Sequence, residues 1–185
     1  MTAATHQRGG LLCGLITHQI FIAPLYAEAN TYSKLFIITL YCAATTVGSL
    51  LPDIDMTSSQ MGKLLPFISK CITSRFKHRT MTHSLLSIIF FFILMSFAPL
   101  LNIGKDFYIL LICGLMVGHT SHIILDLFTN QGVCLFYPCK IKIKLANFKT
   151  GAKGERFINH ALLVSMVLYF LYETYTVMVY AFHLR

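Results

Sequence analysis

The chain has 185 residues, of which 56% are hydrophobic and 12% are charged, whereas an ordinary soluble domain carries roughly a quarter charged residues. This composition excludes an intrinsically disordered chain and argues against a soluble globular domain or a two-domain enzyme, since nearly every apolar segment would be used in crossing a membrane. The net charge is +8. In a membrane protein such an excess indicates orientation and contact with anionic lipid before it indicates nucleic-acid binding.

Five apolar segments, taken in chain order, predict five membrane spans. They lie at about residues 10–27, 35–52, 83–101, 107–128 and 157–182, and each is close to the roughly 20 residues that cross a bilayer as a helix. All five are expected to be helical because lipid offers no hydrogen-bond partner to an open backbone. The predicted fold is therefore all-α, a polytopic membrane helical bundle of about five spanning helices, with residues 1–185 forming one domain.

The basic residues lie mainly on alternate linkers between these spans. Twelve of the fifteen share one side: Arg8, Lys63, Lys70, Arg75, Lys77, Arg79, Lys140, Lys142, Lys144, Lys149, Lys153 and Arg156. The other side keeps Lys34, Lys105 and Arg185. The positive-inside bias then places the N-terminus and the basic linkers in the cytoplasm. Within these linkers, the alternation from Lys140 to Lys144 predicts a short strand or a surface ribbon.

Carboxylates stand at the ends of two spans, where solvation is poor. Asp53 and Asp55 end the second span and Asp126 ends the fourth. Their desolvation must be offset by a metal, a partner charge or water, which makes such residues functional candidates. The alternative for Asp53 and Asp55 is an ordinary solvated turn at a helix end.

A histidine-rich segment, His78-Arg79-Thr80-Met81-Thr82-His83, leads into the third span. Thr82 is expected to be the N-cap, so the segment would deliver imidazoles to a helix N-terminus, where an anionic group is also favoured. Taken singly, a histidine is more often structural or exposed than a ligand, but two within six residues beside an arginine favour a site.

The fourth span carries a histidine and carboxylate face. His119, His122 and Asp126 are spaced by three, four and seven residues, which puts them on one face of a helix. His122 and Asp126 form a His-x-x-x-Asp pair suited to clamping a metal. The alternative is a buried polar pair that holds helices together. His18, His160 and His183 are interpreted as structural.

The five-span topology brings these groups to one end of the bundle. The set comprises His6, Asp53, Asp55, His78, His83, His122 and Asp126. Since a catalytic zinc takes three protein ligands and a water, the set exceeds the need of one ion, and two or three ions are conceivable. Histidine nitrogen with carboxylate oxygen suits Zn²⁺, with Mn²⁺ or Fe²⁺ less favoured, and the absence of cysteine from the set argues against a structural zinc site.

These motifs resemble a known family. The resemblance rests on Thr5-His6, Gly48-Ser49-Leu50-Leu51-Pro52-Asp53-Ile54-Asp55, His78-Arg79, Thr82-His83-Ser84, Ser121-His122-Ile123-Ile124-Leu125-Asp126 and Glu155-Arg156-Phe157. The chain resembles the YdjM family of metal-dependent hydrolases of the bacterial inner membrane, described as LexA-regulated or LexA-binding. That family is in turn similar to zinc-dependent phospholipase C and P1-type nucleases.

The resemblance implies roles for individual residues. It implies metal ligation, by one to three Zn²⁺ ions, for His6, Asp53, His83, His122 and Asp126, with Asp55 and His78 as ligands or their supports and Glu155 as a further acidic candidate. Asp55, His78 and Arg79 are the catalytic candidates, Arg79 as a partner for phosphate. His119 is outside the family pattern.

Several functions follow as expectations. The first is a multi-pass inner-membrane hydrolase whose site faces the cytoplasm and cleaves a phosphoester, most plausibly of an anionic phospholipid, by metal-activated water. The second is a non-enzymatic membrane protein that binds a cytoplasmic partner such as LexA, with the His/Asp set structural. A transporter is weaker because no acidic residue lies through the membrane middle. Nucleic acid is disfavoured because aromatic residues are scattered in the basic linkers.

Overall fold

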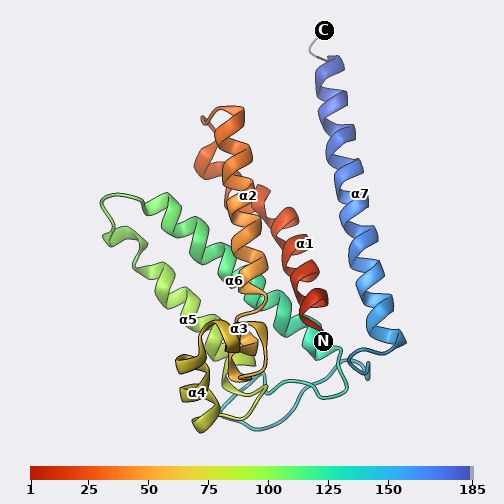
Figure 1. Ribbon diagram of the computed structural model, residues 1–185. Helices are drawn as coiled ribbons and strands as arrows, with labels where there is room; N and C mark the ends of the chain where they lie inside the picture. The colour runs from red at the N-terminus through yellow and green to blue at the C-terminus, as the bar shows by residue number, and fades with distance from the viewer. Residues whose placement is uncertain (184–185) are drawn as a thin grey trace.

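The computed structural model describes the backbone of residues 1–183, which is dominated by helices (Figure 1). In chain order the elements are α1 (Ala3–Phe21), η1 (Ala23–Tyr26), α2 (Thr31–Gly48), η2 (Pro52–Asp55), α3 (Gln60–Leu64), α4 (Pro66–Arg75), η3 (Met81–His83), α5 (Leu85–Ser96), η4 (Ala98–Leu100), α6 (Lys105–Leu127) and α7 (Lys153–His183). No strand is assigned within residues 1–183. The expectation of an all-α fold is confirmed.

The centre of the bundle is the three-helix packing of α1, α2 and α6. Glycines allow these helices to approach closely. A Cβ on Gly118 of α6 would lie 1.9 Å from the carbonyl oxygen of Thr45, and one on Gly48 of α2 would lie 2.3 Å from that of Leu115. Small residues at helix crossings are the usual means of close packing in membranes, where lipid removes most of the hydrophobic drive between helices. This crossing brings the end of α2 beside the last turns of α6.

Each of the five predicted spans corresponds to a helix. By length and composition, Thr31–Asp55, Lys105–Leu127 and Lys153–Val179 are able to cross a membrane, and Leu85–Leu100 is a shorter apolar helix. The first span differs from the prediction because α1 starts at Ala3 and ends at Phe21. The prediction extended the span to 27, where the chain instead forms the short helix η1 around Pro24.

The basic linkers lie at one end of the bundle. Figure 1 shows the N-terminus, α3, α4 and the loop between α6 and α7 gathered at the lower end, as expected from the alternate charge. The lysine-rich alternation forms a ribbon with an isolated bridge, in which Ile143 and Val133 exchange backbone hydrogen bonds of 2.9 and 3.0 Å. Of the three basic residues expected on the other side, Arg185 lies outside the described residues.

Helix α7 stands beside the bundle and packs against α1 (Figure 1). Only 6% of its most apolar window is buried. Near the upper end, the Gln19 side-chain amide donates a hydrogen bond to Glu173. The long apolar surface of α7 is what a lipid-facing helix requires.

Candidate metal centre

The His/Asp cluster forms where four segments of the chain meet at the lower end of the bundle. The first turns of α1 contribute His6, η2 contributes Asp53 and Asp55, and the last turns of α6 contribute His122 and Asp126. The loop that follows α4 and the short helix η3 add His78, Arg79 and His83. The 3₁₀ turn of η2, which starts at Pro52, directs Asp53 and Asp55 into the cluster. The sequence-predicted residues other than Glu155 are thus brought together.

Four of the ligand atoms lie at distances that a metal ion could bridge. His83 Nε2 and His122 Nε2 are 3.2 Å apart. Asp53 Oδ1 lies 3.7 Å from the first and 3.6 Å from the second, and Asp126 Oδ2 lies 3.6 Å from both. Two ligand atoms on a tetrahedral zinc with bonds of about 2.0–2.1 Å are about 3.3–3.4 Å apart. These five distances therefore come close to the separation that a small divalent ion sets between two of its ligands.

A second ion has candidate ligands as well. His6, His122 and Asp126 have ligand atoms within 4.8 Å of one another, and so do Asp53, His78 and His83. The two sets place His6 and His78 on either side of the four atoms above, where each could complete a further position. The described residues thus offer donors for one ion or for two.

The rings of His122 and His6 are held with nitrogen lone pairs available. The Nδ1–H of His122 donates to the carbonyl oxygen of Ser49 at 2.6 Å, which fixes the tautomer with a free Nε2. His6 stacks on His122, with 3.5 Å between the ring centroids, and neither of its ring nitrogens has a hydrogen-bond partner although the side chain is fully buried. The His6 Nε2 atom lies 3.4 Å from Asp126 Oδ1. His6 is therefore a buried imidazole without a well-directed hydrogen bond, of the kind that a metal satisfies.

Asp55 acts as an anchor for the histidine-rich segment. One carboxylate oxygen accepts a hydrogen bond from His78 Nδ1 at 2.6 Å, and the other accepts from the Arg79 amide at 3.0 Å and from the Thr82 hydroxyl at 2.6 Å. The expectation that Thr82 caps the third span is therefore wrong. Ser84 occupies the N-cap position of α5, with no side-chain cap. With its oxygens occupied, Asp55 is suited to positioning His78.

His83 has its charge balance set by the surrounding carboxylates. Burial lowers the pKa of His83, but Asp53 and Asp55 outweigh that effect and raise it above the ordinary value. Its Nε2 faces Asp53 and Asp126 and its Nδ1 faces Asp55 at 3.4 Å.

Arg79 lies inside the cluster and faces Asp126. Its Nη2 is 2.8 Å from Asp126 Oδ2, its Nη1 donates to the Thr129 hydroxyl at 2.6 Å, and the side chain is buried. The backbone of Arg79 has a φ of 63°, which is unfavourable for a residue with a Cβ. The Met1 amino group donates to Asp126 Oδ1 at 2.7 Å. Arg79 is thus committed to Asp126 in this structure, and the predicted phosphate contact would require it to move.

Two of the predicted candidates lie outside the cluster. Glu155, at the start of α7, accepts hydrogen bonds from the Thr2 and Thr5 hydroxyls and from the Gly151 amide. Its oxygens are occupied in joining α7 to α1, so it is placed as a structural anchor. His119 pairs with Ser87 through Nε2 at 2.7 Å and is separate from both candidate ligand sets.

Access to the cluster is from one side. The side chains of His6, His83, His122 and Asp126 are at most 1% exposed, whereas Asp53 is 16% and His78 is 33% exposed. Asp53 also lines a cavity of about 300 Å³. A substrate would therefore meet the Asp53 and His78 side first.

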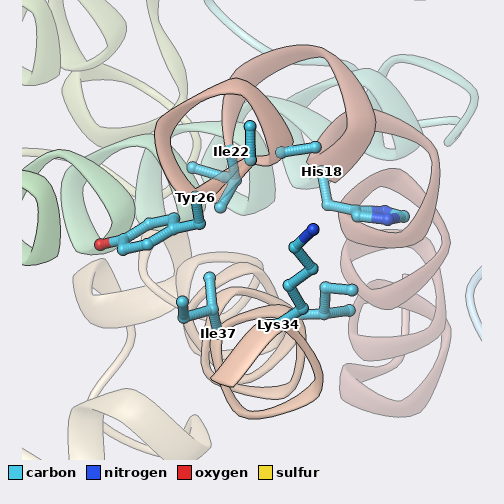
Figure 2. A pocket seen from close by; sticks show the side chains of 8 residues that line it. His18, Ile22, Tyr26, Lys34 and Ile37 are labelled. Atoms are coloured by element: carbon cyan, nitrogen blue, oxygen red, sulfur yellow. The ribbon is translucent and has the colours of Figure 1, made fainter. Parts of the chain in front are cut away.

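Another cavity, of about 320 Å³, lies at the opposite end of α1 and α2 (Figure 2). Lys34 extends toward its middle among Ile22, Tyr26 and Ile37. No carboxylate lines this cavity within the described chain. His18 borders it, and the His18 ring contacts the Leu15 carbonyl of its own helix, as His160 contacts that of Arg156. Both histidines lie away from the cluster, and the His183 side chain is outside the described part.

Sequence reasoning missed the residues that support the cluster. Thr82 and Thr129 bind Asp55 and Arg79 through hydroxyl groups, and Ser49 acts through its backbone carbonyl. A threonine three residues after a functional carboxylate, as at Asp126 and Thr129, gives only a weak signal. The Ser49 contact gives none, because every residue has a carbonyl.

These features define a class, an all-helical membrane protein with a buried His/Asp cluster at one end of its bundle. A family model described as YdjM inner membrane protein matches residues 1–182, and the chain belongs to that family. It is 38% identical to the protein YvsG of Bacillus subtilis strain 168, over 92% of this chain and 94% of that one. It is 33% identical to the inner membrane protein YdjM of Escherichia coli K12, over 89% of this chain and 80% of that one. No solved structure matches.

Proposed function

We propose that the protein is a membrane-bound, metal-dependent hydrolase that cleaves a phosphoester of a lipid headgroup at the cytoplasmic face of the inner membrane. The observation that carries the proposal is the close set of two histidine nitrogens and two carboxylate oxygens: His83 Nε2 and His122 Nε2 lie 3.2 Å apart, and each lies 3.6–3.7 Å from Asp53 Oδ1 and from Asp126 Oδ2. Its position at the basic end of the bundle supports a phosphate-containing substrate, because the lysines there attract anions.

The donor set suits Zn²⁺, with Mn²⁺ or Fe²⁺ as alternatives. When bound, such an ion supplies Lewis-acid polarisation of a phosphoryl oxygen and lowers the pKa of a water molecule. His83, His122, Asp53 and Asp126 would hold it, and the unsatisfied nitrogens of His6 mark a position for a further ligand or ion.

The residues at the open side have separate tasks. His78 is the most exposed member of the cluster, and its Nδ1–H donates to Asp55. That contact leaves Nε2 as the atom that accepts a proton from a water or returns one to a leaving group. Asp55 orients this ring and also holds the Arg79 amide, which keeps the segment in register with the cluster. His6, His122 and Asp126 lie on the fully buried side of the cluster, from which bulk water is excluded.

The test is hydrolysis of lipid phosphodiesters by the purified protein in lipid nanodiscs with Zn²⁺, Mn²⁺ or Fe²⁺ added. Asp53→Asn is expected to reduce activity by at least the 10–100-fold typical of residues that merely support a metal ligand. Asp106→Asn is the matched control, because Asp106 lies in the first turn of α6, at the other end of the helix that carries Asp126. Equal activity in wild type and Asp53→Asn would refute the proposal.

A non-enzymatic role is the second candidate, and the Arg79–Asp126 contact favours it. That ion pair, 2.8 Å long and buried, balances part of the cluster's charge without a metal. The His/Asp set would then hold the helices together while the basic linkers bind a cytoplasmic partner of the LexA type. This alternative predicts a folded protein that binds no metal and hydrolyses no phosphoester.

A further inference from the structure

An apolar cavity of about 810 Å³ lies between α4 and α5, next to the metal centre. Ile68 and Ile72 of α4 form one wall, Leu86 and Phe90 of α5 form the other, and Ile54 of η2 also lines it. Its volume falls in the range of pockets that hold small molecules. The remaining lining residues are also mainly apolar, which favours an apolar occupant.

The cavity opens on a surface that a membrane would cover. Leu86 and Phe90, four residues apart on one face of α5, are 45% and 55% exposed, and Ile68 of α4 is 50% exposed. Helix α4 also carries the exposed basic residues Lys70 and Arg75. Exposed basic residues beside apolar ones are favourable at the lipid interface, where their charges meet anionic headgroups.

The cavity adjoins the metal centre at Thr82. Thr82 lines the cavity, and its hydroxyl donates to Asp55, the carboxylate that also holds His78. Ile54, another lining residue, stands between Asp53 and Asp55 in η2. A molecule in the cavity therefore lies one side chain away from the cluster.

One buried polar atom in the cavity wall lacks a partner. His119 is 4% exposed, and its Nδ1 has no hydrogen-bond partner. Ser87 Oγ pairs with His119 Nε2 at 2.7 Å and also lies within hydrogen-bond distance of the carbonyl oxygens of Thr82 and Ser84. The Nδ1 atom on the other side of the ring is left without a partner, which a water or a hydroxyl group that enters with a bound molecule would supply.

We propose that this cavity binds an acyl chain of a membrane lipid whose phosphate lies at the His/Asp cluster. The apolar walls take the acyl chain, the basic residues Lys70 and Arg75 of α4 attract the anionic headgroup, and Thr82 lies between the cavity and the cluster. This inference rests on the proposed function for the chemistry at the headgroup. The acyl-chain site itself is argued from the cavity and does not depend on that function. The specificity of the enzyme would then be for lipid over soluble phosphodiesters.

The test compares two tryptophan substitutions on α5. The protein has no tryptophan of its own. Leu86→Trp fills the cavity, and Ile89→Trp is the matched control because Ile89 is 48% exposed and does not line it. The first readout needs no catalysis. Metal-free full-length protein is released from detergent with short-chain phosphatidylglycerol, and lipid retained is counted by native mass spectrometry. Wild type and Ile89→Trp are expected to retain lipid that Leu86→Trp loses.

The second readout is hydrolysis of short phosphatidylglycerols that differ in acyl length, below their micelle concentrations, with glycerophosphoglycerol as the chainless substrate. For wild type and Ile89→Trp, KM is expected to fall by about fourfold with each buried methylene. In Leu86→Trp this dependence disappears, whereas Ile89→Trp turns over glycerophosphoglycerol at the wild-type rate.

The outcomes separate the two proposals. Retention that differs between the two variants, without hydrolysis of any substrate, supports the acyl site and refutes the hydrolase. Hydrolysis with no dependence on acyl length, and equal retention in all three proteins, overturns the acyl site and leaves the hydrolase. Equal retention would also be the result if the cavity received a peptide of a partner protein instead.

Discussion

His122 donates its Nδ1–H to the Ser49 carbonyl at 2.6 Å, and this contact joins the last turns of α6 to the residue that follows α2. The bond determines which ring nitrogen carries the proton and turns the other toward His83, Asp53 and Asp126. Metal-binding histidines almost always have such a partner on the second nitrogen, because it fixes the tautomer and the ring plane. The backbone at the end of α2 thus prepares a side chain of α6.

Metal content follows directly from this arrangement. The double variant His122→Ala/Asp126→Ala removes one nitrogen and one oxygen from the four candidate ligand atoms, so we expect it to lose the zinc that wild type carries. The measurement is mass-spectrometric metal analysis of detergent-purified protein. His160→Ala is the control, since His160 contacts its own helix. Wild-type protein that is folded and stays metal-free after zinc addition would contradict the prediction.

A variant of Glu155 tests whether this residue is a structural anchor or a metal ligand. Glu155→Gln weakens the hydrogen bonds from Thr2 and Thr5 that hold α7 to α1, so we expect a lower thermal unfolding temperature with unchanged zinc stoichiometry. Hydrogen bonds to a charged acceptor contribute about 1.5–3 kcal/mol each. Glu173→Gln, at the other contact between α1 and α7, serves as the comparison. Loss of zinc from folded Glu155→Gln would return Glu155 to the ligand set.

Asp55→Asn tests the positioning of His78. The amide keeps the shape of the side chain but replaces one acceptor by a donor, which then faces His78 Nδ1–H or the Arg79 and Thr82 donors. A buried donor left unsatisfied costs about 1–3 kcal/mol. We expect lower stability in a detergent thermal melt, while Asp106→Asn melts like wild type. An unchanged melt would show that Asp55 does not hold this segment.

The close crossing of α2 and α6 predicts a strong effect from one methyl group. Gly118→Ala would place a Cβ 1.9 Å from the Thr45 carbonyl, so the helices must separate. Overpacking of this kind typically costs about 1–3 kcal/mol, and the separation also moves His122 and Asp126 away from Asp53. We expect lower thermal stability together with weaker zinc binding. Ala161→Val, on the exposed surface of α7, should change neither.

Orientation is testable with native cysteines. Cys71 and Cys139 are exposed and lie on the linkers of the basic end, whereas Cys42 and Cys134 are buried. A membrane-impermeant maleimide should label Cys71 and Cys139 in inverted vesicles and leave them unlabelled in intact spheroplasts. Ile103→Cys in a background without these two cysteines should give the opposite pattern, because Ile103 is 92% exposed in the turn before α6. Labelling of Cys71 in intact spheroplasts would show that the protein has the opposite orientation.

The sequence predicts the helices and the membership of the cluster because both depend on local patterns. Apolar length marks the spans, and charge marks the end of the bundle where Asp53, His83 and Asp126 meet. The pattern does not reveal which carboxylate is left free for a metal and which is taken up by hydrogen bonds within the protein. Asp53 and Asp55 are two residues apart, yet one faces His122 while the other is saturated by His78 and Thr82. That difference arises from the 3₁₀ turn and from long-range contacts, which leave no trace in spacing.

The sparse packing of α7 against the bundle affects the order in which the helices can assemble during synthesis. The cluster residues that the structure brings together precede the end of α6 at Leu127, and the last helix adds an anchor through Glu155 rather than a cluster residue. Because chains emerge from the ribosome N-terminus first, helices α1, α2 and α6 can associate in the bilayer before α7 is synthesised. Glu155 then joins Thr2 and Thr5, so a helix that is inserted later secures residues that were translated earlier.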